Sequence, residues 1–199
     1  MTQPSEKIIE IVRRGGLIIF PTETIYGLGC DATNEDAVRR VFELKAREAG
    51  KPPPLLVSGE AQLGSLVAEV PPFASELMQR FWPGALTIVL RVKPHVSSLL
   101  TATNSAGDAT IAVRHSAHAT AQQLCERLGA PLVATSANLS GASGRAACPQ
   151  TLDEVALVLR RRADAEIDGG AVGGLPSTIV DCSGATPKVL RQGAIELGF

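Results

Sequence analysis

The chain has 199 residues, of which 45% are hydrophobic and 20% are charged, and its 19 basic side chains nearly balance its 20 acidic ones. This length fits one ordinary domain with a substantial core. The high apolar content and the net charge of −1 exclude disorder as the main state, and they exclude a global basic field for long nucleic acids.

The sequence also indicates the cellular compartment of the protein. No stretch approaches the roughly 18 apolar residues of a membrane span, and the amino terminus lacks the apolar core of a signal peptide. The four cysteines are scattered and form no C-x-x-C pair, which argues against a zinc ribbon and favours a reducing environment. We therefore expect a cytoplasmic protein without a membrane segment, and one domain over residues 1–199.

The amino-terminal half alternates short apolar runs with helical spacing, the pattern of an α/β domain. A helix around Ile8 to Val12 is predicted to end at Gly15-Gly16, and residues 17–20 read as a buried strand. Asn34 is a plausible N-cap for a helix over 35–45.

The middle of the chain continues this alternation. Strands are predicted over 54–58, 86–92 and 110–114, and Pro72 opens a helix that ends at the turn Trp82-Pro83-Gly84. Ser116 is predicted to cap a further helix, which runs to Leu128 and stops at Gly129.

The last third returns to strands. Residues 132–135 form a predicted strand before the small polar loop SANLSGASG, and Thr151 to Glu154 reads as a capping box for a helix through about Arg161. The short return between strands near Ile179 and Val189 predicts antiparallel pairing. The sheet is therefore expected to be mixed.

Several common catalytic motifs are missing from the sequence. It contains no phosphate loop of the G-x-x-x-x-G-K-[ST] type, no G-x-G-x-x-G, no H-E-x-x-H and no G-x-S-x-G elbow. His115 and His118 lie three residues apart, a spacing compatible with a pair of metal ligands or with two residues at the start of a helix. The lack of a clear third ligand nearby favours the helix start. No metal-binding residue is predicted.

Hydroxyl and basic residues collect where the predicted strands and helices end, which is where the ligand crevice of an open α/β sheet lies. Such groups could hold a polyanion without a phosphate loop, although hydroxyls in loops also commonly satisfy turns and caps. The residues concerned are Thr22, Thr24, Lys45, Arg47, Lys51, Thr110, Arg114, Thr135, Ser136, Asn138, Ser140, Ser177, Thr178 and Arg191.

Eight sequence islands in order carry a resemblance to a known family. The run from Phe20 to Gly29, FPTETIYGLG, resembles the opening signature of the YrdC-like family of L-threonylcarbamoyladenylate synthases. The other islands are Lys45-Ala-Arg47, Lys51-Pro52, Trp82 to Thr87, Ile111 to Arg114, Ser136 to Gly141, Pro176 to Asp181 and Leu190 to Gly193. Together they span nearly the whole chain, and the chain is similar to the short, single-domain form of the family.

The resemblance implies a twisted, open, mixed α/β sheet with flanking helices around a large concave site. It implies a nucleotidyltransferase that joins L-threonine, bicarbonate and ATP into threonylcarbamoyl-AMP and releases pyrophosphate, for the N6-threonylcarbamoyladenosine modification of tRNA. Mg²⁺ is expected to accompany the nucleotide. The implied partners are these substrates and the downstream tRNA threonylcarbamoyl transferase machinery, while direct contact with RNA is left open.

The resemblance also implies roles for individual residues. Lys45, Arg47 and Lys51 resemble the catalytic charges beside the triphosphate and bicarbonate, while Thr24, Arg114 and Ser177 resemble threonine contacts. The expected ATP contacts are Arg47, Lys51, Thr110, Ser136, Asn138, Ser143 and Arg191.

Two other functions remain open at this stage. One is an RNA-binding or ribosome-assembly factor that uses the same concave basic surface, although seven aromatic residues are few for a stacking groove. The other is a carbamoyltransferase module of the hydrogenase-maturation type, whose zinc-binding cysteine pairs this sequence lacks.

Overall fold

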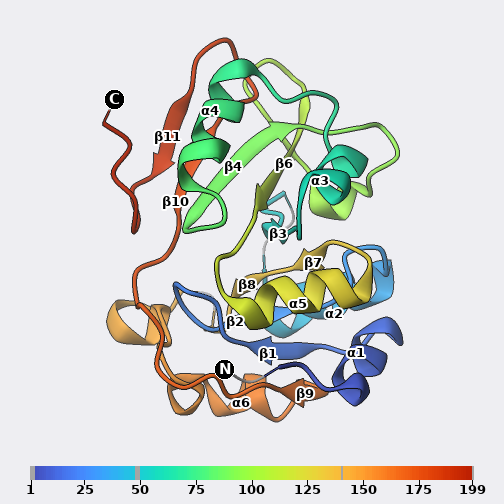
Figure 1. Cartoon of the computed structure of the whole chain (residues 1–199). Helices are drawn as coiled ribbons and strands as arrows, with labels where there is room; N and C mark the ends of the chain where they lie inside the picture. The colour runs from blue at the N-terminus through green and yellow to red at the C-terminus, as the bar shows by residue number, and fades with distance from the viewer. Residues whose placement is uncertain (1–2, 48–49, 140, 199) are drawn as a thin grey trace.

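The computed structural model describes residues 3–47, 50–139 and 141–198, which form two mixed sheets with helices packed around them (Figure 1). The smaller sheet has the order β8 (Thr135–Ser136), β2 (Gly27–Gly29), β1 (Ile18–Phe20), β9 (Ala165–Glu166). The larger has the order β11 (Lys188–Arg191), β10 (Thr178–Asp181), β4 (Leu86–Arg91), β6 (Ala109–Arg114), β3 (Leu55–Leu56), β7 (Leu132–Val133), and β5 (Ala102–Thr103) pairs with β6.

Both sheets combine parallel and antiparallel pairs, as the sequence predicts. Strand β4 runs parallel to β10 and antiparallel to β6, and β10 pairs antiparallel with β11. In Figure 1 strands β11, β10, β4 and β6 of the larger sheet lie in the upper half with α3 (Glu60–Leu66) and α4 (Pro72–Phe81), and its last strand, β7, reaches down beside α5 (Ala119–Leu128). The lower half holds the smaller sheet with α1 (Glu6–Arg13), α2 (Glu35–Lys45), α5 and α6 (Leu157–Arg160).

The helix ends follow local chemistry in most places. Helix α2 has the predicted bounds, and the Asn34 side chain accepts a hydrogen bond from the Ala37 amide. Helix α4 opens on Pro72, and α5 stops at Gly129, whose φ of +74° is a left-handed conformation that favours glycine.

Two predicted caps are wrong. The cap of α5 is His118, whose Nδ1 accepts from the Thr120 amide. Ser116 lies two residues before this cap; its oxygen accepts from the His118 amide, and its hydroxyl donates to the distant Glu23 carboxylate. The Thr151 side chain makes no cap hydrogen bond, and the segment splits into a 3₁₀ turn (Leu152–Glu154) and the short α6. The reason is the extended backbone at Val155, which interrupts the predicted helix.

Strand β2 was not predicted because its sequence, Gly-Leu-Gly, is a poor strand former. Position 29 requires glycine, since a Cβ there would overlap the carbonyl oxygen of Val133 on the neighbouring strand β7. The short elements β5, β9 and α3 were also missed. The packing that requires glycine at position 29 is a contact between β2 and β7, which are far apart in the sequence, so a local sequence pattern does not show it.

The core occupies one face of the larger sheet. Along β4 and β6, Ile88, Leu90, Ile111 and Val113 are fully buried in this core, whereas the residues between them point to the opposite face. The site described below lies on that opposite face.

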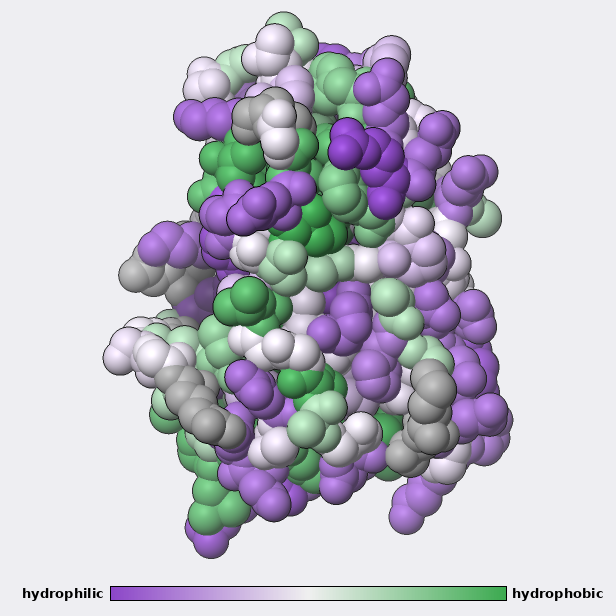
Figure 2. All heavy atoms as spheres, turned by 60° about the vertical axis from the view of Figure 1, so that its left-hand side comes forward, coloured by the Kyte–Doolittle hydropathy of each residue, from purple (hydrophilic) through white to green (hydrophobic). Residues whose placement is uncertain are grey.

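The surface itself is mixed. Figure 2 shows hydrophobic residues as separate green patches among hydrophilic ones on the face that carries β11. Within the described residues, no helix is long and apolar enough to cross a membrane.

Candidate functional site

A cavity of about 670 Å³ lies between the two sheets and collects most of the predicted site residues. Its wall on the larger sheet follows the alternation of extended strands: every second residue of three strands faces it. These residues are Thr87 and Val89 on β4, Thr110, Ala112 and Arg114 on β6, and Ser177, Ile179 and Asp181 on and beside β10. The turn before β2, strand β8 and the segment around Lys51 close the other side.

Cationic side chains dominate the charge of this cavity. Of the described residues that line it, Arg47, Lys51, Arg114 and Arg191 are basic and Asp181 is acidic. Because the low-dielectric walls concentrate this field, the cavity favours anionic ligands.

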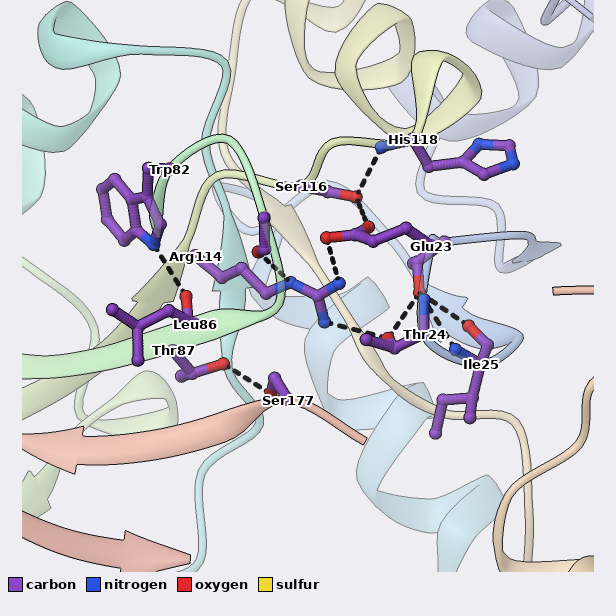
Figure 3. Close-up of polar contacts among 12 residues, drawn as sticks. Glu23, Thr24, Ile25, Trp82, Leu86, Thr87, Arg114, Ser116, His118 and Ser177 are labelled. Carbon is purple, nitrogen blue, oxygen red and sulfur yellow. Dashed lines mark hydrogen bonds and ion pairs between the residues drawn. The ribbon is translucent and has the colours of Figure 1, made fainter. Parts of the chain in front are cut away.

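Arg114, at the end of β6, is held on three sides (Figure 3). Its Nε donates to the Gly84 carbonyl at 3.0 Å, and its Nη1 donates to the Thr24 hydroxyl at 3.1 Å. Its Nη2 lies 2.7 Å from Glu23 Oε1, and the side chain is only 8% exposed. A guanidinium in this position is a fixed planar fork at the cavity wall.

The Trp82-Pro83-Gly84 turn explains one of these contacts. The Trp82 Nε1 donates to the Leu86 carbonyl at 2.7 Å, and the Gly84 amide donates to the His115 carbonyl at 2.8 Å. A Cβ at position 84 would overlap the Phe81 carbonyl oxygen. The turn thus presents the Gly84 carbonyl to Arg114, a structural role for this island.

Ser177 belongs to a second polar chain in the cavity. Its hydroxyl lies 2.8 Å from the hydroxyl of Thr87, and Arg191 donates to its carbonyl oxygen through both Nε and Nη2, at 3.2 and 2.8 Å. The arrangement links the two predicted contacts, Ser177 and Arg191, into one unit.

Lys45 is the predicted residue whose position differs most from expectation. Its side chain is buried and does not line the cavity; its Nζ donates to the Ser136 carbonyl at 2.6 Å and to Asn138 Oδ1 at 2.7 Å. The Ser136 hydroxyl donates to the same Asn138 oxygen at 2.6 Å. Lys45 therefore fixes the loop that carries Ser136 and Asn138, both of which do line the cavity.

The burial of Lys45 has a measurable consequence. Burial, with a smaller contribution from the Arg47 charge, lowers the pKa of Lys45 to about 8. Between pH 8 and its ordinary value of 10.5 the unfolded state binds more protons at this residue, so its contribution to stability should rise with pH. We expect the unfolding free energy of the wild type minus that of Lys45→Met to rise by about 1 kcal/mol per pH unit in this window. Urea unfolding of both proteins across the window measures it, and a constant difference would contradict the shifted pKa.

Arg47 and Lys51 lie at the cavity edge. Arg47 donates to the carbonyl of Lys51, to the Pro52 carbonyl at 3.1 Å and to the Thr135 hydroxyl at 3.2 Å. Arg47 thereby fastens the segment of Lys51 to strand β8, and Lys51 itself is exposed at the cavity.

The other predicted residues divide between the cavity and the surface. Thr110 lines the cavity, and its hydroxyl donates to the Ala102 carbonyl at 3.2 Å. Ser143 is exposed and does not line the cavity, and Ser140 lies outside the described residues. His118 serves as the start of α5, and no group of three His, Cys, Asp or Glu side chains suited to a metal occurs among the described residues.

Sequence reasoning missed three contributors to the site. Thr87, Gly84 and Glu23 all fall inside islands that were quoted for their resemblance, so their positions were on view. What was missing was the three-dimensional contact of each with Ser177 or Arg114.

Comparison with known proteins identifies the family of the chain. The profile of the Sua5/YciO/YrdC family, described as "Telomere recombination", matches residues 10–193. The chain belongs to this family. A threonylcarbamoyl-AMP synthase of Thiobacillus denitrificans is 40% identical over 184 residues, which cover 90% of this chain and 90% of that one. The family resemblance and the expected open α/β fold are both confirmed.

Other relatives of this Sua5/YciO/YrdC chain are longer. The threonylcarbamoyl-AMP synthase of Bacillus subtilis is 39% identical over 186 residues, which are 93% of this chain and 52% of the relative. The crystal structure of Pyrococcus abyssi Sua5 complexed with L-threonine matches with a TM-score of 0.85 and 38% identity, over 96% of this chain and 56% of that one. This chain thus spans about half the length of these two relatives.

Proposed function

We propose that this chain synthesises threonylcarbamoyl-AMP from L-threonine, bicarbonate and ATP, with release of pyrophosphate. The observation that carries the proposal is the fixed guanidinium of Arg114, at the wall of a cavity whose other cations are Arg47, Lys51 and Arg191. The fixed guanidinium can bind the carboxylate of an amino acid, and the other cations can bind a triphosphate. The names of the relatives of this chain support the same assignment.

L-Threonine is assigned to the end of the cavity formed by Arg114, Thr24 and Ser177. The planar fork of Arg114 suits a carboxylate because two N–H groups can bond both oxygens. The Thr24 and Ser177 hydroxyls are buried at the cavity wall and supply neutral hydrogen-bond partners for the rest of the amino acid. A relative of this chain was crystallised with L-threonine, which supports the assignment.

ATP is assigned to the remainder of the cavity. Lys51, Arg47 and Arg191 would neutralise the phosphates, while Thr110, Ser136 and Asn138 would bond the nucleotide. Lys45 acts indirectly, as a positioning residue for Ser136 and Asn138. Since no acidic cluster for a metal occurs among the described residues, Mg²⁺ would enter with ATP and be held by phosphate oxygens and water.

The chemistry then needs positioning more than a protein nucleophile. The threonine ammonium gives up a proton to solvent, its free amine attacks bicarbonate, and loss of water leaves a carbamate. A carbamate oxygen then forms a bond to the α-phosphorus of ATP, and the bond from this phosphorus to the oxygen that bridges it to the β-phosphorus breaks, so that pyrophosphate leaves. In-line placement and cancellation of the gathering negative charge are the main requirements of such a displacement. The product would then serve the tRNA threonylcarbamoyl transferase machinery.

Pyrophosphate release with and without L-threonine tests the proposal. We expect release from ATP and bicarbonate to depend on L-threonine, with threonylcarbamoyl-AMP as the second product. Pyrophosphate release that is indifferent to threonine, or no release at all, would contradict the assignment. An RNA-binding factor or a carbamoyltransferase module predicts no threonine dependence.

A further inference from the structure

Glu23 is a partly buried acid beside the predicted threonine site, and the proposed reaction does not use it. It lies in the turn between β1 and β2, next to Thr24, and its side chain is 22% exposed. It does not line the cavity, and it faces Arg114 from the protein side (Figure 3).

Contacts from two other segments hold Glu23 in place. The Ser116 hydroxyl donates to Oε2, and the His118 amide donates to the Ser116 oxygen at 3.2 Å. A Cβ at Gly173 would come within 2.6 Å of the Glu23 carbonyl oxygen, so the glycine-rich loop packs directly on the main chain of this residue. Ser116, just before α5, thus fixes the carboxylate, and the loop before Ser177 fixes the backbone that carries it.

The carboxylate is charged at neutral pH. Burial alone would raise the pKa of Glu23, but the Arg114 charge and the hydrogen bonds from Ser116 and Arg114 bring the pKa below its ordinary value. The Arg114–Glu23 pair therefore carries no net charge.

We propose that Glu23 is a positioning and specificity-determining residue, which orients Arg114 and cancels its charge so that the site accepts an amino-acid zwitterion in preference to a simple carboxylate. This inference rests on the proposed function, in which Arg114 binds the threonine carboxylate.

The reason is the charge balance of the occupied site. Counted over Arg114, Glu23 and the ligand, a carboxylate without an ammonium group leaves a net charge of −1, whereas a zwitterion leaves zero. Arg191, bound to Ser177 nearby, adds the same positive charge in both cases and so does not change the difference. Without Glu23, Arg114 would be an uncompensated cation in a partly buried site, and such a cation attracts any small anion.

The variant Glu23→Gln separates charge from shape. The glutamine carbonyl can take the place of Oε1 beside Arg114 Nη2, and its amide can donate to the Ser116 oxygen. The probe is 3-hydroxybutyrate, which keeps the carboxylate and hydroxyl of threonine and lacks the ammonium group. Titration calorimetry of both ligands gives the ratio of their dissociation constants.

We expect Glu23→Gln to reduce the preference for threonine over 3-hydroxybutyrate by about tenfold or more. The matched control is Glu76→Gln, because Glu76 is exposed on α4 and the substitution removes the same charge. The control should leave the ratio unchanged. A melting curve of each variant establishes that it is folded.

The outcomes separate the two proposals. If the wild type does not bind threonine, the proposed function fails and this inference fails with it. If the wild type binds threonine and Glu23→Gln keeps the wild-type ratio, only this inference is overturned. If Glu23→Gln does not fold, Glu23→Ala takes its place, since it also removes the charge: a reduced preference for threonine supports the proposal, and the wild-type ratio overturns it.

Discussion

Arg114→Ala is expected to raise the threonine KM far more than the ATP KM. Loss of a charged hydrogen-bond partner in a partly buried site costs about 2–5 kcal/mol, which corresponds to roughly 30-fold to several-thousand-fold in affinity. The effect should be selective because Arg114 lies at the Thr24 end of the cavity, whereas Arg47 and Lys51 lie at the cavity edge. Steady-state pyrophosphate release at varied threonine and varied ATP measures both constants.

Two further variants make this result specific. Arg91→Ala removes an exposed arginine of β4 that pairs with Glu69 at the surface, and it should leave both constants unchanged. Arg114→Ala leaves the Glu23 carboxylate without its counter-charge. Arg114→Lys keeps a positive charge beside Glu23, but a lysine cannot offer a planar fork. A raised threonine KM in Arg114→Lys therefore identifies the fork itself. Unchanged threonine affinity in both variants would remove Arg114 from this role.

Serine is expected to be a poor substrate, by about 10- to 200-fold in kcat/KM relative to threonine. The two amino acids differ by one methyl group, and an apolar contact with a methyl is worth only about 1–3 kcal/mol. Thr24, Tyr26 and Leu28 are the residues that the sequence suggests for this contact. The structure places Thr24 and Tyr26 on the cavity and Leu28 in the core, and it adds Ile25 to the cavity wall.

Tyr26 also has a structural role that a test must separate. Its hydroxyl accepts from the Gly169 amide at 2.9 Å and donates to the Gly170 carbonyl at 2.9 Å, so it anchors the loop that leads to Ser177. For this reason the cleaner measurement compares the two amino acids on the wild-type protein, at matched concentration, by formation of the adenylate product. Equal turnover of serine and threonine would show that the methyl group is not recognised.

The sequence alone was sufficient where the controlling contacts are local. Asn34 caps α2 through an amide three residues away, Gly129 ends α5 through its own backbone conformation, and alternation along β4 and β6 separates core from cavity residues. That polar residues gather in one site was also predictable, but its place was not: the sequence predicts a crevice beyond the strand ends, whereas the cavity lies across a face of the larger sheet and is lined by alternate residues of β4, β6 and β10. Most of the predicted site residues do line one cavity.

The tertiary structure alone decided what depends on contacts between distant segments. Ser116 is a good cap by its residue type, yet the helix begins after His118, and the Ser116 hydroxyl donates to Glu23, 93 positions away. Lys45 reads as a phosphate-binding cation, yet its ammonium holds the Ser136–Asn138 loop, 91 and 93 positions away. The physical reason is that a buried polar group must find a partner, and at these positions the fold supplies a better partner than the neighbouring residues or solvent.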